Sequence, residues 1–559
     1  MVNLYLEDTY SKVLLGVGFY FIAIVLFLLT LITTKISNLD YASDFLGLVN
    51  KLPICFWASI VFVYAGLIVA YSTKKVSLFL IGVIILVFIL FMTPASLEPY
   101  GDHPVSYGVT GISAKIVEGV YPLDIVPWLS MPYLAYKGFP ILIYSLANIP
   151  NISVINLIRF FPVFSVISIV LLLFLFYRKI DGNLEVIFLS LMIFVPLLYW
   201  HIFCTPQLLS YILIITFLVI YAKQEQKKSS QNLVTLLILS FSIIITHILG
   251  SLFIIVLLAM KHLVTLHKSK RCDFVTFFIF VVLFLSWMMY PAFFFFDESI
   301  PYLYTSYQDF ADLFFKLTLG QIGTHVSLQK MIVRYSTVLP LGFCVIVSFS
   351  IIVALFIKRR HTLYLLPICS FFAASLLLLI PYGGDINLTR TGDFILIGSS
   401  FFTALFFRYF FIQEHKYLKI LPFVIILFFI FNHPIAYRGS SAMTLIPPSE
   451  IYGCSFFVKT SSRESSYFSQ SGLAIVNYLD PYRAYISGAK VFSLWYPPLN
   501  EFDITQNFQY VLHGLRDHNG LLLYLEYDPV LEKLANTDKT FNNVYDNGYF
   551  WIYQRAMNP

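Results

Sequence analysis

The chain has 559 residues, of which 59% are hydrophobic and only 12% are charged. Soluble domains carry about 25% charged residues because their surface meets water, so the composition excludes an ordinary soluble domain and predicts a chain that lies largely in a lipid bilayer. The net charge of +6 does not indicate a nucleic-acid partner, because the basic residues stand in short groups between apolar runs rather than on one face.

Thirteen apolar runs are long enough to cross a bilayer as helices. A span needs about 20 mostly apolar residues, because lipid leaves the backbone N–H and C=O groups to pair within the helix. The expected spans are residues 13–33, 54–72, 76–94, 154–177, 184–200, 207–222, 231–247, 249–266, 273–295, 336–357, 362–381, 392–412 and 418–434. The first run has no small-residue cleavage site after it, so we expect a retained anchor.

Lysine and arginine residues alternate in density between successive loops. Every second loop, counted from the N-terminus, is rich in them, as at residues 74–75, 178–179 and 358–360, whereas the alternate loops are longer and poorer. By the positive-inside rule this pattern predicts a cytoplasmic N-terminus and an extracytoplasmic C-terminus. Because no sorting signal indicates an organelle, we expect a multi-pass protein of the cell (plasma) membrane.

The spans and loops divide the chain into four regions. Residues 1–94 hold three helices, residues 95–153 form a large outer loop, residues 154–434 hold ten helices with another outer loop at 296–335, and residues 435–559 form an outer domain. In the last region, Asp546-Asn547-Gly548 separates two strand-like runs and predicts a hairpin. We therefore expect an α-helical polytopic membrane protein of about thirteen transmembrane helices with a small C-terminal extracytoplasmic α/β domain.

The stretch 98–140 is the first that could carry chemistry, because it is polar, rich in glycine and proline, and attached to the third span. It begins with Glu98, Asp102 and His103 and continues through Glu118 and Tyr136. A carboxylate partly removed from water accepts a proton from a hydroxyl more readily. Asp102 is therefore a candidate catalytic base with His103 as its hydrogen-bonding partner; alternatively, Asp102 only caps a helix on the membrane surface.

Two arginines stand near the expected outer ends of spans. Arg390 is the only cation of its short loop, which suits it to bind a lipid phosphate; alternatively, it pairs with Asp385 or Asp393. Arg159 is expected slightly inside a span, where an ionisable residue is costly and tends to be functional. The alternative for Arg159 is that its long side chain reaches back to the membrane surface.

Two histidines, His201 and His247, end spans on the same expected side. They either line the same cavity as Asp385, bind a metal, or are ordinary hydrogen-bonded histidines. No second ligand follows either of them four residues later, which favours the ordinary role. The six cysteines form no CxxC pair, so they indicate neither a zinc site nor a disulfide framework.

The stretch from about residue 98 to 180 resembles the first large outer loop and following span of the GT-C glycosyltransferases. This superfamily includes protein O-mannosyltransferases, aminoarabinose transferases and the catalytic subunit of oligosaccharyltransferase. The similar features are a loop acid, an acidic-Gly-aromatic-Pro step, an aromatic-Gly-Pro step that enters a helix, and an arginine that opens the next span. They are found here at Asp102, Glu118–Pro122, Tyr136–Leu142 and Arg159.

The resemblance implies a function and roles for residues. Members of the superfamily transfer a sugar from a polyprenyl-phosphate donor to a protein, lipid or glycan acceptor on the outer face of the membrane. It implies that Asp102 is the base or the ligand of a divalent metal, such as Mg²⁺ or Mn²⁺, and that Arg390 binds the donor phosphate, with Arg159 as a further candidate. In this chain the loop follows the third span rather than the first, and His103 stands where many members have a second acid.

Other functions stay open at this point. A transporter, a flippase or a polymer ligase would act on the same lipid-linked sugars, and a GT-C-like scaffold without activity would explain the missing second acid. Transporters usually place ionisable residues at the bilayer midplane on broken helices. Here the ionisable residues gather at the outer ends of the spans, which favours chemistry at the outer face.

Overall fold

The structure is a computed structural model. It describes residues 2–34, 46–98, 106–111, 135–149, 152–199, 202–268, 274–293, 328–378, 386–414, 416–439, 448–461, 467–469, 479, 510–514, 541–546 and 550–555.

Among these residues, nine helices are long and apolar enough to cross a membrane. They are α1 (Val2–Thr33), α3 (Ile54–Thr73), α4 (Val76–Val87) with its continuations η2 (Phe88–Met92) and α5 (Thr93–Leu97), α9 (Val154–Ile180), α11 (Pro206–Gln226), α13 (Ile248–Lys268), α16 (Leu328–Ile357), α18 (Ile386–Phe406) with η6 (Phe407–Glu414), and α19 (Leu421–Arg438). This confirms a polytopic helical membrane protein.

Shorter helices complete the bundle. They are α2 (Leu48–Lys51), α8 (Gly138–Ala147), α10 (Leu184–Leu197), α12 (Ser230–Thr246), α14 (Val275–Met289), η5 (His361–Tyr364) with α17 (Leu365–Leu377), and η7 (Lys416–Leu418). Each of the thirteen expected spans falls on one of the helices of the bundle. Helix α8 lies in the region expected to be an outer loop, and α2 lies between the first two expected spans.

The bundle is built around α10 and α18. Every residue of α10 from Val186 to Leu197 is buried, and α18 packs against α10, α16 and α17. A helix that is apolar on all sides can be surrounded by protein rather than by lipid. Helices at the edge, such as α1 and α14, instead leave large apolar side chains exposed, among them Phe21 and Phe278.

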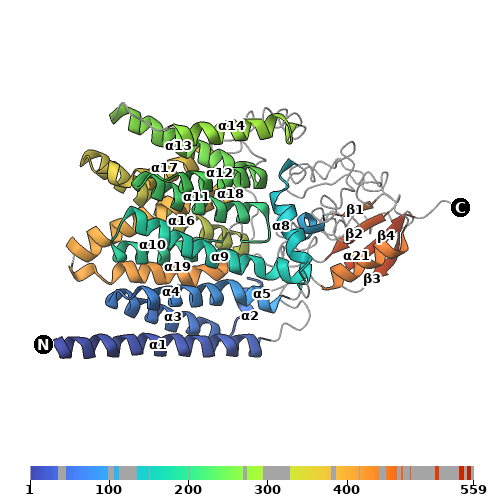
Figure 1. The fold of residues 1–559 in the computed structure, drawn as a ribbon. Helices are drawn as coiled ribbons and strands as arrows, with labels where there is room; N and C mark the ends of the chain where they lie inside the picture. Colours follow the sequence, from blue (N-terminus) through green and yellow to red (C-terminus); the bar gives the residue numbers. More distant parts are fainter. Residues whose placement is uncertain are drawn as a thin grey trace.

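The first three spans form a layer along one side of the bundle (Figure 1). The Tyr20 side chain of α1 fits against glycines of α3 and α4. A Cβ atom at Gly66 or Gly82 would lie 2.3 or 2.1 Å from Tyr20. Small residues allow this close approach of helices in membranes, so these two glycines fix how the N-terminal spans pack.

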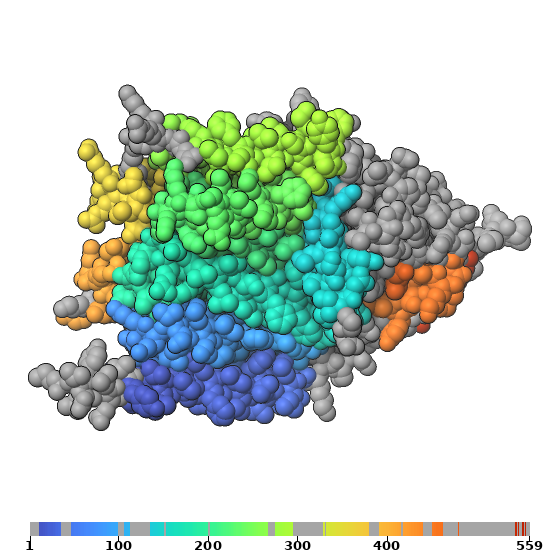
Figure 2. All heavy atoms as spheres, in the orientation of Figure 1, coloured from blue at the N-terminus to red at the C-terminus, as the bar shows by residue number. Residues whose placement is uncertain are grey.

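The two ends of the bundle differ in the lengths of their connections. We call one the long-loop end, where α5, α8 and the C-terminal sheet lie, and the other the short-loop end, where α3 turns into α4 and α9 into α10 (Figure 1). Figure 2 shows the helices packed into one body, with α21 (Pro448–Thr460) standing out beyond the long-loop end.

A small four-stranded sheet lies at the long-loop end. It consists of β1 (Tyr467–Ser469), β2 (Tyr510–Gly514), β3 (Phe541–Asp546) and β4 (Phe550–Arg555), in the order β1-β2-β4-β3. Strands β3 and β4 pair antiparallel, which confirms the expected hairpin, whereas β1 and β2 are parallel. Helix α21 packs on β4, and Leu512 and Ile552 are buried.

Candidate functional site

Four of the ten candidate residues have described side chains, namely Glu98, Tyr136, Arg159 and His247, and all four belong to the long-loop end. The backbone of Arg390 lies in the first turns of α18 at the same end, but its side chain is outside the described part. Asp102, His103, Glu118, His201 and Asp385 also lie outside the described residues. Their expected roles therefore stay predictions.

Arg159 holds the end of α5. Its Nε donates a hydrogen bond to the Ala95 carbonyl oxygen at 2.9 Å, and its Nη2 donates to the Ser96 carbonyl oxygen at 3.2 Å. The last carbonyl groups of a helix have no partner within the helix, and a cation that reaches them also interacts favourably with the helix dipole. Arg159 therefore points to a neighbouring helix end.

Glu98 directly follows α5, whose last carbonyls bond to Arg159, and it pairs with a second arginine. Its Oε2 is 3.6 Å from Nη1 of Arg438, the last residue of α19. Glu98 is 0% exposed and Arg438 is 5% exposed. We call Glu98, Arg159 and Arg438 the Glu98 cluster; it joins three helices that are distant in the sequence.

Aromatic and backbone contacts fix the position of Arg438. Its guanidinium lies 4.2 Å from the centroid of the Tyr437 ring, and the Tyr437 hydroxyl donates to the Ile202 carbonyl at 3.0 Å. One turn earlier, His433 Nδ1 is 3.0 Å from the Pro196 carbonyl oxygen. The end of α19 is thereby held against the end of α10.

Sequence reasoning missed Arg438 because it ended the last span at residue 434 and assigned the following residues to the C-terminal domain. Pro434 lies at that predicted boundary, yet α19 continues through it to Arg438. The available signal was an arginine one turn beyond an apolar run, which is the same signal that singled out Arg159 at the start of α9.

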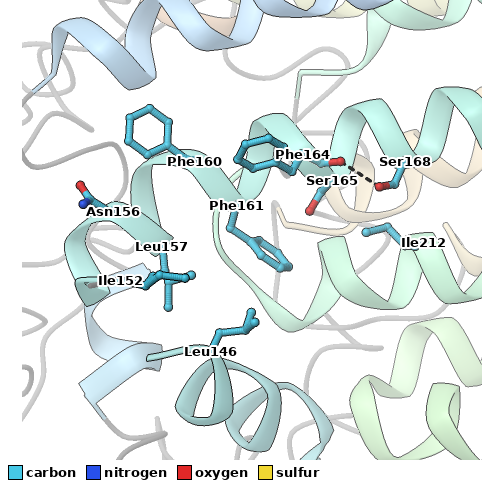
Figure 3. Close-up of a pocket in the computed structure, with 10 residues that line it drawn as sticks. All are labelled: Leu146, Ile152, Asn156, Leu157, Phe160, Phe161, Phe164, Ser165, Ser168 and Ile212. Carbon is cyan, nitrogen blue, oxygen red and sulfur yellow. Dashed lines mark hydrogen bonds between the residues drawn. The ribbon is translucent and has the colours of Figure 1, made fainter. Parts of the chain in front are cut away.

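A groove of about 440 Å³ opens beside the Glu98 cluster, mostly along α9 (Figure 3). Its lining residues are Leu146, Ile152, Asn156, Leu157, Phe160, Phe161, Phe164, Ser165, Ser168 and Ile212. The Phe160 ring is also 5.0 Å from Cζ of Arg159. The volume is in the range of ligand-binding clefts. Because Phe160 lines the groove and also contacts Arg159, this ring connects the apolar groove with a cation.

Tyr136 and His247 belong to a second group at the same end. The Tyr136 hydroxyl is 3.3 Å from Sδ of Met288, and Trp287 Nε1 donates to the Ala135 carbonyl at 3.1 Å. A Cβ atom at Gly138 would be 2.7 Å from the hydroxyl of Thr246, the residue before His247. The Tyr136–Gly138 step therefore packs the start of α8 against α12 and α14.

The two groups are connected through α8 and α9. The rings of Phe139 and Phe161 pack edge to face with centroids 6.0 Å apart, and Phe161 lines the groove. Within the described part of the chain, no three His, Cys, Asp or Glu side chains lie together in a way that could hold a metal ion.

The first turns of α18 contain a further buried acid, Asp393, which is 4% exposed. The hydroxyl of Tyr211 donates to the backbone carbonyl of Asp393 and so fixes α18 against α11. Arg390 lies one turn before Asp393 on α18. Both of its expected roles, phosphate binding and pairing with an acid, stay predictions.

No family model matches this chain, and no curated protein sequence matches it. Solved structures do. An apo crystal structure of the oligosaccharyltransferase of Archaeoglobus fulgidus is similar with a TM-score of 0.50 at 11% sequence identity, over 85% of this chain and 74% of that chain.

Two crystal structures of ArnT from Cupriavidus metallidurans are also similar. The apo structure has a TM-score of 0.48 at 12% identity, and the structure bound to undecaprenyl phosphate has 0.45 at 11% identity; each comparison covers 86% of this chain and 98% of that one. At such identities the likeness to the oligosaccharyltransferase concerns the fold alone, and it agrees with the resemblance noted in the sequence. By its fold, the chain is similar to this membrane oligosaccharyltransferase.

Proposed function

We propose that this protein is a membrane glycosyltransferase that transfers a sugar from a polyprenyl-phosphate-linked donor to an acceptor at the long-loop end of the bundle. The observation that carries the proposal is the meeting of an apolar groove with the half-buried Arg159 at that end of a GT-C-like fold, with the buried Arg438 in the same cluster. A lipid-linked sugar needs both features side by side, because its chain is apolar and its phosphate is anionic.

The donor lies with its chain along α9 and its phosphate toward the Glu98 cluster. Phe160, Phe161 and Phe164 line the groove in which an isoprenoid chain would lie (Figure 3), and Arg159 lies next to the Phe160 ring. Arginine suits this role because its planar N–H groups match the oxygens of a phosphate. Arg390 is the second proposed phosphate ligand, as the resemblance implies.

The reaction is a displacement at the anomeric carbon of the sugar. Asp102, four residues after Glu98 in the chain, accepts the proton of the acceptor group as that group forms its bond to the anomeric carbon. The bond between this carbon and the phosphate oxygen breaks, and polyprenyl phosphate leaves. Cations held in place before the reaction stabilise the charge that develops on the leaving oxygen.

The long-loop end faces the extracytoplasmic side in this proposal, and the N-terminus is cytoplasmic. Basic residues at the short-loop end support this orientation: Lys74 and Lys75 lie between α3 and α4, Arg178 and Lys179 end α9, and Arg359 and Arg360 follow α16. Cytoplasmic loops carry such an excess of lysine and arginine. The sugar, the acceptor and the use of a divalent metal are to be established by assay.

The test is sugar transfer by purified protein in lipid nanodiscs. Wild-type protein and the Asp102→Asn variant are given a panel of polyprenyl-phosphate sugars, with Mg²⁺, with Mn²⁺ and with a chelator, and released polyprenyl phosphate is measured. We expect a loss of about 100-fold or more in the variant, which is the size of a general-base contribution.

The matched control is Glu185→Gln, which changes a carboxylate at the opposite end of the bundle and should keep its activity. Full activity of Asp102→Asn with an unchanged unfolding temperature would remove Asp102 from the mechanism. Donor binding by the wild type without any release of polyprenyl phosphate would contradict the transferase and indicate a flippase or a scaffold.

A further inference from the structure

The Glu98 cluster contains an anion of its own. Glu98 lies 3.6 Å from a guanidinium nitrogen of Arg438 on α19. Arg159 on α9 donates to the Ala95 and Ser96 carbonyls, three and two residues before Glu98, so the carboxylate lies in a place that a phosphate would also seek. We propose that Glu98 is a specificity-determining residue, a resident carboxylate that sets the charge of this anion site so that it holds a singly charged phosphodiester more tightly than a doubly charged phosphomonoester. This inference rests on the proposed function.

The geometry of the ion pair is the first argument. Glu98 and Arg438 are both buried, yet their closest charged atoms are 3.6 Å apart, which is longer than a charge-assisted hydrogen bond of about 2.7–2.9 Å. A buried ion pair repays the loss of hydration only when its geometry is close and complete. The separation is therefore long for a pair whose role is stability alone.

The donors of Arg159 are the second argument. Its two bonds to the carbonyls of Ala95 and Ser96 hold the side chain in place. They use two of the five N–H groups that a guanidinium carries. Arg159 is thus already oriented before an anion arrives, which lowers the entropic cost of binding.

The charge of Glu98 is the third argument. A polyprenyl-phosphate sugar is a phosphodiester with a single negative charge, whereas the released polyprenyl phosphate is a phosphomonoester with a charge of about −1.5 to −2 at neutral pH. A buried carboxylate beside the phosphate repels the more highly charged product more strongly than it repels the donor. Glu98 therefore favours the donor over the product and promotes product release.

The position beside the groove is the fourth argument. Phe160 contacts both the groove and Arg159, so a lipid whose chain follows α9 brings its phosphate to the cluster. Inorganic phosphate offers the same oxygens without the chain. The lipid headgroup is therefore the ligand to which we assign the site, and a comparison with inorganic phosphate separates the two sources.

The experiment measures binding to the full chain in nanodiscs without acceptor. The probes are undecaprenyl phosphate, a glycosyl undecaprenyl phosphate, inorganic phosphate and undecaprenol. In Glu98→Gln, we expect the affinity for undecaprenyl phosphate to rise about tenfold, equivalent to about 1.4 kcal/mol, with a much smaller change for the glycosyl diester. Inorganic phosphate at the same concentration should not compete; equal competition would overturn the assignment to a lipid headgroup.

The matched control is Glu185→Gln, because Glu185 pairs with two cations at the opposite end of the bundle. Its affinities should equal those of the wild type. The inference is wrong when Glu98→Gln is folded and binds undecaprenyl phosphate no more tightly than the wild type does. Affinity for undecaprenol should be the same in all variants, and a parallel rise for undecaprenol would show that charge is not the cause.

A second pair of variants keeps the test decisive when Glu98→Gln does not fold. Arg438→Gln lowers the charge of the cluster to zero, and Glu98→Gln/Arg438→Gln returns it to +1 while removing the ion pair. The double variant must bind undecaprenyl phosphate more tightly than Arg438→Gln alone. No difference between them would overturn the role of Glu98.

The outcomes also separate this inference from the proposed function. If the wild type prefers the diester over the monoester but transfers no sugar, the proposed transferase activity is contradicted and the role of Glu98 is not. If the wild type and Glu98→Gln both transfer sugar and undecaprenyl phosphate inhibits them equally, only the inference about Glu98 is contradicted.

Discussion

Two carboxylates, Glu98 and Glu185, pair with cations at opposite ends of the same bundle. At the short-loop end, Glu185 is 2.8 Å from Lys74 Nζ and 3.3 Å from Arg408 Nε, and its side chain is 22% exposed. At the long-loop end, Glu98 is fully buried and its closest contact to Arg438 is 3.6 Å. We call Lys74, Glu185 and Arg408 the Glu185 cluster.

The difference shows that one pattern of charges serves two purposes. The Glu185 cluster connects the turn between α3 and α4 with the start of α10 and the start of η6. Its bonds are shorter and water reaches it, so little desolvation opposes them. Burying the charges of the Glu98 cluster costs more desolvation free energy, and its ion-pair distance is longer. Of the two clusters, only the Glu98 cluster borders the groove. We infer structural support at the short-loop end and anion binding at the long-loop end.

The largest effect should follow from Arg438→Ala. The substitution leaves the buried carboxylate of Glu98 without its partner from α19, and breaking a buried pair in this way costs about 3–5 kcal/mol. The measurement is thermal unfolding in nanodiscs. Glu98→Gln/Arg438→Gln should recover most of the loss, and a loss below about 1 kcal/mol in Arg438→Ala would show that the pair is effectively hydrated.

A smaller effect is expected at the groove. Phe160→Ala removes the ring between the groove and Arg159 and should weaken binding of undecaprenyl phosphate about tenfold, or about 1.4 kcal/mol. Phe428→Ala is the control, because Phe428 is an aromatic residue of α19 with an exposed side chain. Similar affinities of the two variants would remove the groove from the lipid-binding site.

Glu185→Gln should cost about 1 kcal/mol or less, because its pairs are partly exposed to water. The unfolding temperature of this variant should therefore lie well above that of Arg438→Ala. The comparison between the two clusters fails when the order of the two unfolding temperatures is reversed.

The smallest effect concerns salt. Raising the ionic strength from about 0.1 to about 1 M shortens the Debye length from roughly 10 to 3 Å. The destabilisation caused by Glu185→Gln should shrink as the exposed pairs are screened, whereas that of Arg438→Ala should persist because salt does not enter its buried site. Equal sensitivity to salt would show that both clusters are hydrated alike.

Much of the architecture could be predicted from local patterns. Each expected span falls on a helix because a long apolar run is removed from water, where its backbone N–H and C=O groups must pair with one another. Arg159 could be singled out because an ionisable residue inside such a run is costly by itself. The hairpin of β3 and β4 could be predicted because its turn residues and strands are adjacent.

The sequence by itself therefore determined the membrane class and the positions of the apolar helices, since these depend on side chains that are near one another in the chain. Only the tertiary structure decided that Glu98 meets Arg438, that Tyr20 fits against Gly66 and Gly82, and that the Tyr136–Gly138 step packs on α12. These contacts join helices that are far apart in the sequence, so no local pattern predicts them. Hydropathy indicates that a helix is removed from water but not which helix packs against it.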